Sequence, residues 1–216
     1  MKSLLFAAFS LFILSCGNGN SKNNDQKQTA NVQPVQAEAP QGLAKAYFSG
    51  GCFWCEEAIF ESLKGVKEAH SGYAGGEMKN PTYENSDGHA ETVEVIYDPE
   101  VISYENLVRV YFGSENPTQV NGQGPDHGIH YRSIIFYQNE QQKATIEKVK
   151  NEIAKNYDQP IAAEIIPFQK FWMAEDYHQN YERNHPENPY VQNVSIPRIN
   201  RFKSKFPELL KESAKE

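Results

Sequence analysis

The chain has little cysteine and fewer basic than acidic residues, and each shortage removes a class of function. Three cysteines are present, and only Cys52 and Cys55 form a Cys-x-x-Cys pair. A structural zinc site needs four ligands, so without a second such pair we expect no metal. Lysine and arginine together number 21 against 28 acidic residues, which gives a formal charge of −7. Because the chain is acidic and has no basic patch interleaved with aromatics, we expect no nucleic-acid partner.

The apolar run at the N-terminus is too short to span a bilayer. It covers Leu4–Leu14 behind the charge of Lys2, which is typical of a signal peptide. The next residues, ILSCG, resemble a bacterial lipobox, in which Cys16 would be lipidated and become the new N-terminus. The alternative is an ordinary signal peptide with a stray cysteine. We therefore expect residues 1–15 to be a lipoprotein signal peptide and the protein to be extracytoplasmic, held to a membrane in the periplasm or at the cell surface.

Large apolar residues are almost absent from Gly17–Gly42, which is rich in Asn, Gln, Ser, Gly and Pro. Such a segment cannot bury enough surface to order itself. Residues 16–42 are therefore predicted to form a flexible, lipid-anchored linker. Residues 43–216 are long enough to enclose one hydrophobic core, and we expect this domain to be monomeric.

The predicted domain mixes strand and helix patterns along the chain. Apolar periodicity predicts strands at 45–50, 91–99, 131–137 and 162–168, and helices at 52–63, 103–113 and 139–157. A turn is predicted at Gly72–Gly76. Beyond Trp172 we expect a helix near 175–184, extended coil over 185–197, and a last helix that ends at Leu210. This mixture favours an α/β or α+β two-layer sandwich, but periodicity does not fix the strand order.

The stretch GGCFWCEE, Gly50–Glu57, follows the first predicted strand. If Cys52 opens the helix, the free N–H groups and the helix dipole would lower the pKa of its thiol. Cys55 lies three residues on, on the same helix face and within reach of Cys52. The bulky Phe53 and Trp54 indicate an apolar pocket beside a nucleophile. A buried disulfide, a metal site completed by HGIH (residues 127–130) and a thiol-exchange pair remain alternatives.

Three further stretches concentrate polar side chains. GHAETVEVIYDP places Glu91 at the start of a strand, where burial would raise the carboxyl pKa and make a general acid. DHGIHYRSI, Asp126–Ile134, precedes an apolar strand and indicates a loop that lines a site. The stretch that begins at Phe171 is both aromatic and acidic, and its Tyr177 and His178 are expected to pack and hydrogen-bond locally.

Taken together, GGCFWCEEAIF, GHAETVEVIYDP, DHGIHYRSIIFY and FWMAEDYHQNY resemble the motifs of the peptide methionine sulfoxide reductase A (MsrA) family. The resemblance runs from about Ala46 to Phe206. It implies a two-layer sandwich with a ferredoxin-like core, a mixed sheet and a long coil region at the C-terminus. Residues 43–216 would then be an MsrA-type catalytic domain, a peptide-methionine (S)-S-oxide reductase acting on protein-bound or free methionine sulfoxide.

The resemblance also implies a catalytic set. Cys52 would attack the sulfoxide sulfur as a thiolate, release methionine and become a sulfenic acid. Glu91 would protonate the sulfoxide oxygen, and Tyr83 and Tyr131 would hydrogen-bond it.

Three other positions would bind the substrate. By the same resemblance, Phe53 and Trp54 would hold the methyl group of the sulfoxide. Asp126 would line the pocket or contact the substrate backbone.

The chain departs from a common pattern of the family at Cys55, where many members have glycine and keep a resolving cysteine near the C-terminus. No cysteine lies in Phe171–Glu216. A GCFWC subgroup uses the nearby cysteine, so Cys55 would resolve the sulfenic acid and form a disulfide with Cys52. A thioredoxin-like dithiol would reduce that disulfide, and no bound cofactor is expected. A general CxxC thiol-disulfide oxidoreductase and a non-enzymatic lipoprotein remain the alternatives.

Overall fold

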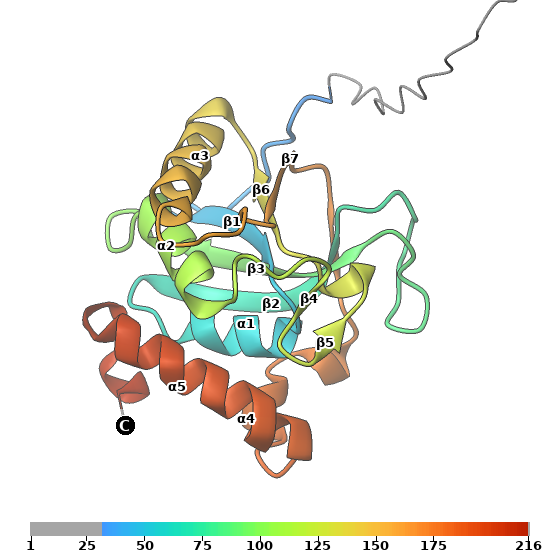
Figure 1. Ribbon diagram of the computed structural model, residues 1–216. Coiled ribbons are helices and arrows are strands. Elements are labelled where there is room, and N and C mark those ends of the chain that lie inside the picture. Colours follow the sequence, from blue (N-terminus) through green and yellow to red (C-terminus); the bar gives the residue numbers. More distant parts are fainter. Residues whose placement is uncertain (1–31, 216) are drawn as a thin grey trace, which may run out of the picture. The chain divides into compact units, whose positions relative to one another are not determined.

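A mixed sheet of six strands, in the order β7-β6-β1-β3-β2-β8, organises the part of the chain that the structure describes. The computed structural model describes residues 32–215 (Figure 1). The strands of this sheet are β1 (Ala44–Ser49), β2 (Val66–Ala74), β3 (Ala90–Tyr97), β6 (Ile134–Tyr137), β7 (Glu164–Pro167) and β8 (Phe171–Met173). A separate two-stranded ribbon joins β4 (Gly122–Gln123) to β5 (Asp126–His127).

The helices are α1 (Phe53–Glu61), α2 (Tyr104–Ser114), α3 (Glu140–Ala154), α4 (Tyr181–Asn184) and α5 (Ile196–Lys205). The order β1-α1-β2-β3-α2-β6 and the spatial order β6-β1-β3-β2, with antiparallel neighbours, are those of a ferredoxin-like core. Strand β7 extends one edge in parallel with β6, and β8 extends the other edge antiparallel to β2. The two-layer sandwich with a ferredoxin-like core and a mixed sheet is therefore confirmed.

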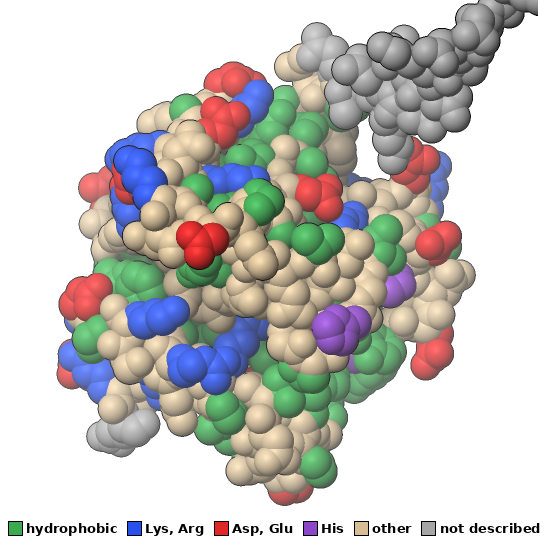
Figure 2. Space-filling view, viewed as in Figure 1, with side chains coloured by type: hydrophobic (Ala, Val, Ile, Leu, Met, Phe, Trp, Pro, Cys, Tyr) green, Lys and Arg blue, Asp and Glu red, His purple; other side chains and the backbone are tan. Residues whose placement is uncertain are grey.

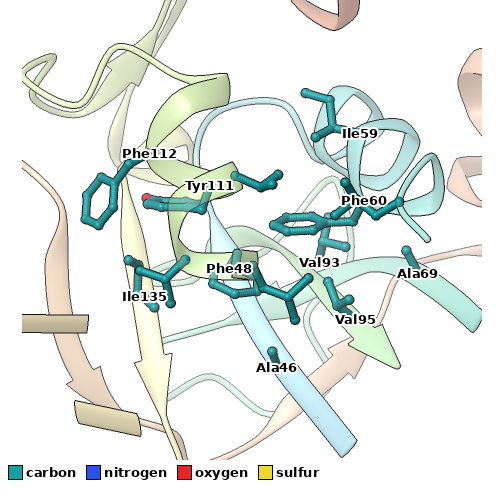
Figure 3. Packing of buried hydrophobic residues seen from close by; sticks show 14 of the residues in the cluster. Ala46, Phe48, Ile59, Phe60, Ala69, Val93, Val95, Tyr111, Phe112 and Ile135 are labelled. Atoms are coloured by element: carbon teal, nitrogen blue, oxygen red, sulfur yellow. The ribbon is translucent and has the colours of Figure 1, made fainter. Parts of the chain in front are cut away.

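The main core lies between the sheet and the helices. Phe48 of β1 stacks on Phe60 of α1 at 4.8 Å and on Tyr111 of α2 at 5.5 Å (Figure 3). Alternation along β1 sends Tyr47 to the opposite face, where its ring stacks on Phe168 at 3.9 Å. Both faces of the central strands are therefore covered, which explains why all of β3 is buried.

The compact unit begins at Val32, earlier than residue 43, where the sequence places the start of the domain. The Val35 N–H donates to the Phe168 carbonyl at 2.8 Å, and the Ala37 N–H donates to Gln138 Oε1 at 2.8 Å. These bonds add backbone pairing that residue composition does not reveal, so the later part of the predicted linker packs on the domain. The predicted signal peptide and Cys16 lie outside the described residues. Within residues 32–215, no helix is long and apolar enough to cross a membrane.

The turn predicted at Gly72–Gly76 is wrong at its start, because β2 continues to Ala74. Gly72 allows β2 and β8 to pair closely. A Cβ there would lie 2.3 Å from both the Phe171 ring and the Trp172 carbonyl of β8. Sequence patterns did not reveal β2 or β8.

The C-terminal region also differs from the prediction. The helix expected near 175–184 is reduced to two short turns, because Asn180 between them is left-handed, with φ of 56°. The predicted coil over 185–197 instead contains a helical turn, Val191–Ser195, that leads directly into α5. Pro197 stands in the first turn of α5. Because it has no N–H, it cannot continue the hydrogen bonding of the preceding turn. Helix α5 ends at Lys205, before the predicted Leu210.

Candidate active site

The chain turns sharply from β1 into α1 through two glycines. Gly51 has φ of +84°, and a Cβ on it would lie 2.5 Å from Gln123 Cβ. Cys52 is the N-cap of α1, so the prediction that it opens the helix is confirmed. This turn places the Cys52 sulfur where the ends of several elements meet.

A cavity of about 250 Å³ contains seven of the residues that the sequence predicts for the site. They come from distant stretches of the chain: Cys52, Phe53, Trp54, Tyr83, Glu91, Asp126 and Tyr131. Asn188 and Tyr190 complete the lining. Residues more than a hundred positions apart in sequence thus face one small space beside the Cys52 sulfur.

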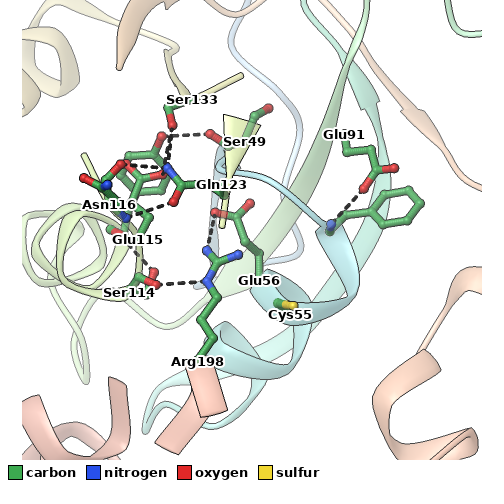
Figure 4. A network of polar contacts seen from close by, with 12 residues as sticks. Ser49, Cys55, Glu56, Glu91, Ser114, Glu115, Asn116, Gln123, Ser133 and Arg198 are labelled. Atoms are coloured by element: carbon green, nitrogen blue, oxygen red, sulfur yellow. Dashed lines mark hydrogen bonds and ion pairs between the residues drawn. The ribbon is translucent and has the colours of Figure 1, made fainter. Parts of the chain in front are cut away.

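Glu91 lies at the start of β3 and is only 5% exposed. One of its oxygens, Oε2, accepts the Phe53 N–H at 3.0 Å (Figure 4). Burial is the main reason that the pKa of Glu91 rises to about 8, and the Phe53 bond opposes it only in part. The carboxyl group is therefore protonated at neutral pH and faces the cavity as a proton donor.

The expectation of a lowered pKa at Cys52 is wrong in this structure. Burial raises the pKa of this thiol well above its ordinary value, and neighbouring Cys55 and Glu91 raise it further. The first N–H of α1, on Phe53, is taken by the Glu91 carboxyl group. The helix terminus therefore stabilises Glu91 instead of a Cys52 thiolate.

Cys55 is 1% exposed and does not line the cavity at Cys52. Both cysteines are free thiols, and a hydrogen bond between them confirms that they are in reach of each other. The Cys55 Sγ lies 3.1 Å from Ser195 Oγ. The bond from Cys52 is the largest of the effects that lower the pKa of Cys55 to about 7, and Arg198 adds to it.

Two phenols stand across the cavity from Cys52. Tyr83 is 43% exposed, and its ring carries a hydroxyl in hydrogen-bond contact with Tyr131. Burial, followed by the nearby Glu91, raises the pKa of both hydroxyls, so both remain donors. The Tyr83 N–H donates to Glu175 Oε1 at 2.9 Å, which fixes the loop that holds this ring.

The two aromatic residues after Cys52 have different supports. Phe53 is fully buried and packs against His178 with ring centroids 4.9 Å apart. The Trp54 indole Nε1 donates to His178 Nδ1 at 3.1 Å, and its ring stacks on Tyr181 at 3.7 Å. Burial lowers the pKa of His178, so the ring stays neutral and accepts this bond. Local packing is confirmed for Tyr177 and His178, whose ring centroids lie 4.1 Å apart. The predicted local hydrogen bond is wrong for the His178 ring, because its partner is the distant Trp54, which it holds in place.

Tyr190 is a lining residue that sequence reasoning missed. Its hydroxyl donates to Asp126 Oδ2 at 2.5 Å. It lies in the Pro-rich stretch predicted to be coil, where no local pattern singles out one tyrosine. Among the described residues, no group of three or more His, Cys, Asp or Glu side chains is arranged to hold a metal ion.

Comparison with known proteins identifies the family of this chain. The model of the family described as "Peptide methionine sulfoxide reductase" matches residues 44–210. The chain belongs to this family. The matched region spans β1 through the turn after α5 and therefore includes every residue of the cavity.

The chain aligns with named relatives over nearly the whole length of those relatives. The reductase is 44% identical over 171 residues to "Peptide methionine sulfoxide reductase MsrA" of Pasteurella multocida, with 77% of this chain and 98% of that protein aligned. It is 44% identical over 170 residues to the protein of the same name from Thermus thermophilus, with 77% and 97% aligned.

Solved structures have the same fold. Methionine sulfoxide reductase A of Corynebacterium diphtheriae aligns with a TM-score of 0.63 and 31% identity, over 73% of this chain and 84% of that chain. Mxr1 from Saccharomyces cerevisiae in its reduced form aligns with a TM-score of 0.65 and 29% identity, over 73% and 93%. The mixed α/β fold of the reductase is thus that of methionine sulfoxide reductases.

Proposed function

We propose that the protein reduces the S epimer of methionine sulfoxide, free or protein-bound, to methionine through Cys52 and Glu91. As a member of its family it is a peptide methionine sulfoxide reductase. The observation that supports the residue roles is the protonated Glu91 carboxyl group in the same small cavity as the Cys52 sulfur. A thiol-exchange protein needs only the two thiols, so a buried acid in this place favours sulfoxide chemistry.

The cavity has a polar and an apolar side that suit a sulfoxide. Phe53 and Trp54 supply ring surface for the substrate methyl group. Glu91, Tyr83 and Tyr131 supply three O–H donors for the sulfoxide oxygen. Because a sulfoxide sulfur is pyramidal, placing the methyl group and the oxygen on fixed sides selects one epimer.

The first step moves an oxygen atom from the substrate to the enzyme. Glu91 gives its proton to the sulfoxide oxygen while the Cys52 sulfur attacks the substrate sulfur and loses its own proton, which Glu91 takes up. The attack forms a bond between the two sulfurs. The substrate sulfur–oxygen bond then breaks as the oxygen moves to Cys52, and the bond between the sulfurs breaks with its electron pair on the departing methionine. Cys52 is left as a sulfenic acid. The raised pKa of Cys52 means that this thiol ionises as it reacts, not before.

The second step closes a disulfide. Cys55 attacks the Cys52 sulfenic acid, the sulfur–oxygen bond breaks, and the oxygen leaves as water. A thioredoxin-like dithiol then reduces the Cys52–Cys55 disulfide. The hydrogen-bond contact between the two thiols supports this assignment, as does the lack of another cysteine in Phe171–Glu216.

We also propose that the enzyme acts outside the cytoplasm as a membrane-anchored lipoprotein. This proposal rests on sequence alone: the charged start, the apolar run Leu4–Leu14 and the small residue before Cys16. Mass spectrometry of the mature protein tests it. A diacylglyceryl group on Cys16 is expected, whereas an intact Met1 or cleavage elsewhere would contradict it.

Two cysteine variants test the assigned order of events. Cys52→Ser should release no methionine, because the attacking sulfur is gone. Cys55→Ser should release about one methionine per enzyme and then stop when a dithiol protein is the reductant, because the sulfenic acid has no partner. Sustained turnover of Cys55→Ser at the wild-type rate would show that Cys55 is not the resolving residue.

A further inference from the structure

A set of buried polar groups faces Cys55 from the side of the C-terminal helix. Ser195 ends the helical turn before α5, and Arg198 lies in the first turn of α5. Their spacing of three residues puts both on one helix face. That face packs on Cys55, and Figure 4 shows Arg198 reaching from α5 to a position beside Cys55 and Glu56.

Arg198 is buried to an unusual degree for an arginine. Its side chain is 9% exposed. The Nε atom donates to the Ser114 carbonyl at 2.9 Å, which fixes the guanidinium group. The Nη2 atom lies 3.7 Å from Glu56 Oε1 and has no hydrogen-bond partner. Burying a cation without full pairing costs free energy. The position of Arg198 beside the Cys55 thiol therefore indicates that its charge acts on this thiol.

Burial weakens the negative charge of the carboxyl groups near Cys55. Burial raises the pKa of Glu56 to about 7 and that of Glu91 to about 8, and it also raises the pKa of Glu182. Burial also raises the pKa of Glu115, which faces Arg198. Glu91 is therefore mostly neutral at neutral pH and Glu56 is about half so, and the half-buried phenol of Tyr190 keeps its proton. Among the described residues, Arg198 is the cation that faces the Cys55 sulfur.

We propose that Ser195 and Arg198 are positioning residues that hold Cys55 as a thiolate for its attack on the Cys52 sulfenic acid. The proposal rests on the assignment of Cys55 as the resolving residue. In the structure the Cys55 thiol donates to Ser195 Oγ at 3.1 Å. Once Cys55 ionises, the Ser195 hydroxyl turns to donate to the thiolate, and the Arg198 charge compensates it. In the attack a sulfur–sulfur bond forms, the sulfur–oxygen bond of Cys52 breaks, and the departing hydroxide takes up a proton to become water.

The same stabilisation acts in the opposite direction during reduction. When a reductant thiolate attacks the Cys52 sulfur, the disulfide bond breaks and Cys55 leaves with the electron pair. A thiol of lower pKa leaves faster. The second thiol of the dithiol then displaces Cys52 from the mixed disulfide, which restores both enzyme thiols.

The test measures the ionisation of Cys55 directly. In a Cys16→Ser, Cys52→Ser background, Cys55 is the sole thiol of the chain, and the serine hydroxyl keeps a donor beside it. The rate of alkylation of Cys55 by iodoacetamide, measured against pH, gives the midpoint of ionisation of its thiol. Arg198→Met should move this midpoint up by about one pH unit, and Arg198→Lys should restore part of the shift. Arg201→Met removes the same charge from the next, exposed turn of α5 and should leave the midpoint in place.

A second readout uses the enzyme with both active thiols. In the Cys16→Ser background, Arg198→Met should form the Cys52–Cys55 disulfide about threefold more slowly at pH 6, relative to methionine release. If Arg198→Met fails to fold, Ser195→Ala decides the question, and its midpoint should also rise. Equal midpoints for Arg198→Met and Arg201→Met, or no rise for Ser195→Ala, would overturn the proposal. Absence of methionine release from the enzyme without these substitutions would instead overturn the proposed function.

Discussion

At the scale of single residues, one contact decides which group the N-terminus of α1 stabilises. The Phe53 N–H is bonded to Glu91, so it cannot also stabilise a Cys52 thiolate. The resting site thus pairs a neutral thiol with a neutral acid, both buried. This arrangement keeps Cys52 from reacting with oxidants before a sulfoxide arrives, because the thiolate is the reactive form.

The protonated state of Glu91 predicts the pH dependence of sulfoxide reduction. Because the pKa of Glu91 is raised to about 8, the proton donor is lost as pH rises through that value. The first-turnover rate of methionine release should therefore fall above pH about 8. Stopped-flow or quenched-flow measurement between pH 6 and pH 10 gives the profile, and a rate that keeps rising to pH 10 would contradict the assignment.

Replacing the acid should separate sulfoxide chemistry from thiol chemistry. Glu91→Gln should lower the rate of methionine release by about 10²- to 10⁴-fold, the range of a general acid. Its thiols should still react with a disulfide probe. Glu94→Gln is the matched control, because Glu94 lies on the same strand but bonds Tyr47 and Lys45 outside the cavity. If Glu91→Gln loses its reaction with the disulfide probe to the same extent as methionine release, Glu91 has a structural role instead.

At the scale of elements, the pairing of β2 with β8 supports the loop that holds Tyr83. Strand β8 leads to Glu175, which bonds the Tyr83 N–H and the Tyr73 hydroxyl of β2. Gly72 permits this pairing, since a side chain there would collide with the β8 backbone at the Trp172 carbonyl. One glycine on β2 thus helps to position a residue of the cavity.

Gly72→Ala should therefore disturb both stability and substrate binding. The collision should lower the free energy of unfolding by about 1–3 kcal/mol, as overpacking does. It should also raise KM, because Glu175 would release the Tyr83 loop. Urea unfolding and steady-state kinetics measure the two effects. Lys67→Gln, an exposed change on the same strand, is the control and should alter neither. A Gly72→Ala protein as stable as wild type would refute the packing argument.

The sequence predicts an element when the signals for it are local, and misses one that depends on pairing with a distant part of the chain. Helix α2 follows from local signals: its apolar periodicity predicts it, and its N-cap Ser103 accepts the Asn106 N–H. Strands β2 and β8 do not, because their pairing depends on a long-range fit at Gly72. The same holds for Tyr190, which reaches Asp126 from a segment with no periodic pattern.

The candidate site was predictable only where a motif marks it. The residues around Cys52 were found by resemblance and meet in one cavity. The pKa of Cys52 was not predictable from its N-cap position, because burial and the partner of the first N–H decide it. Ser195 and Arg198 belong to no recognised motif, and only the packing of α5 on Cys55 brings them into view.

At the scale of the whole molecule, charged side chains are dispersed on the surface, and several ionisable carboxyl groups lie in the interior. Figure 2 shows basic and acidic side chains interspersed over the face in view. Inside, Glu56, Glu57 and Glu91 are each at most 5% exposed. A fold that buries several carboxyl groups beside its reactive centre must keep them protonated or pair them, which links stability to pH.

This burial predicts that stability declines from acidic toward alkaline pH. The pKa values of Glu56 and Glu57 are raised to about 7 and that of Glu91 to about 8, mainly by burial. A carboxyl group with a raised folded-state pKa stabilises fully below its unfolded value and loses this contribution as pH rises through the folded value. The free energy of unfolding should thus be higher at pH 5.5 than at pH 8.5. Glu56→Gln should flatten the difference, and an unchanged slope would contradict the assignment.

In the proposed reaction, the thiol of Cys52 takes oxygen from methionine-S-sulfoxide and passes the oxidation to Cys55. The most direct measurement mixes pre-reduced protein, free of added dithiol, with each sulfoxide epimer and counts products by mass spectrometry. We expect about one methionine per enzyme from the S epimer, an equal amount of Cys52–Cys55 disulfide, and neither from the R epimer. Methionine from both epimers alike, or disulfide without methionine, would contradict it.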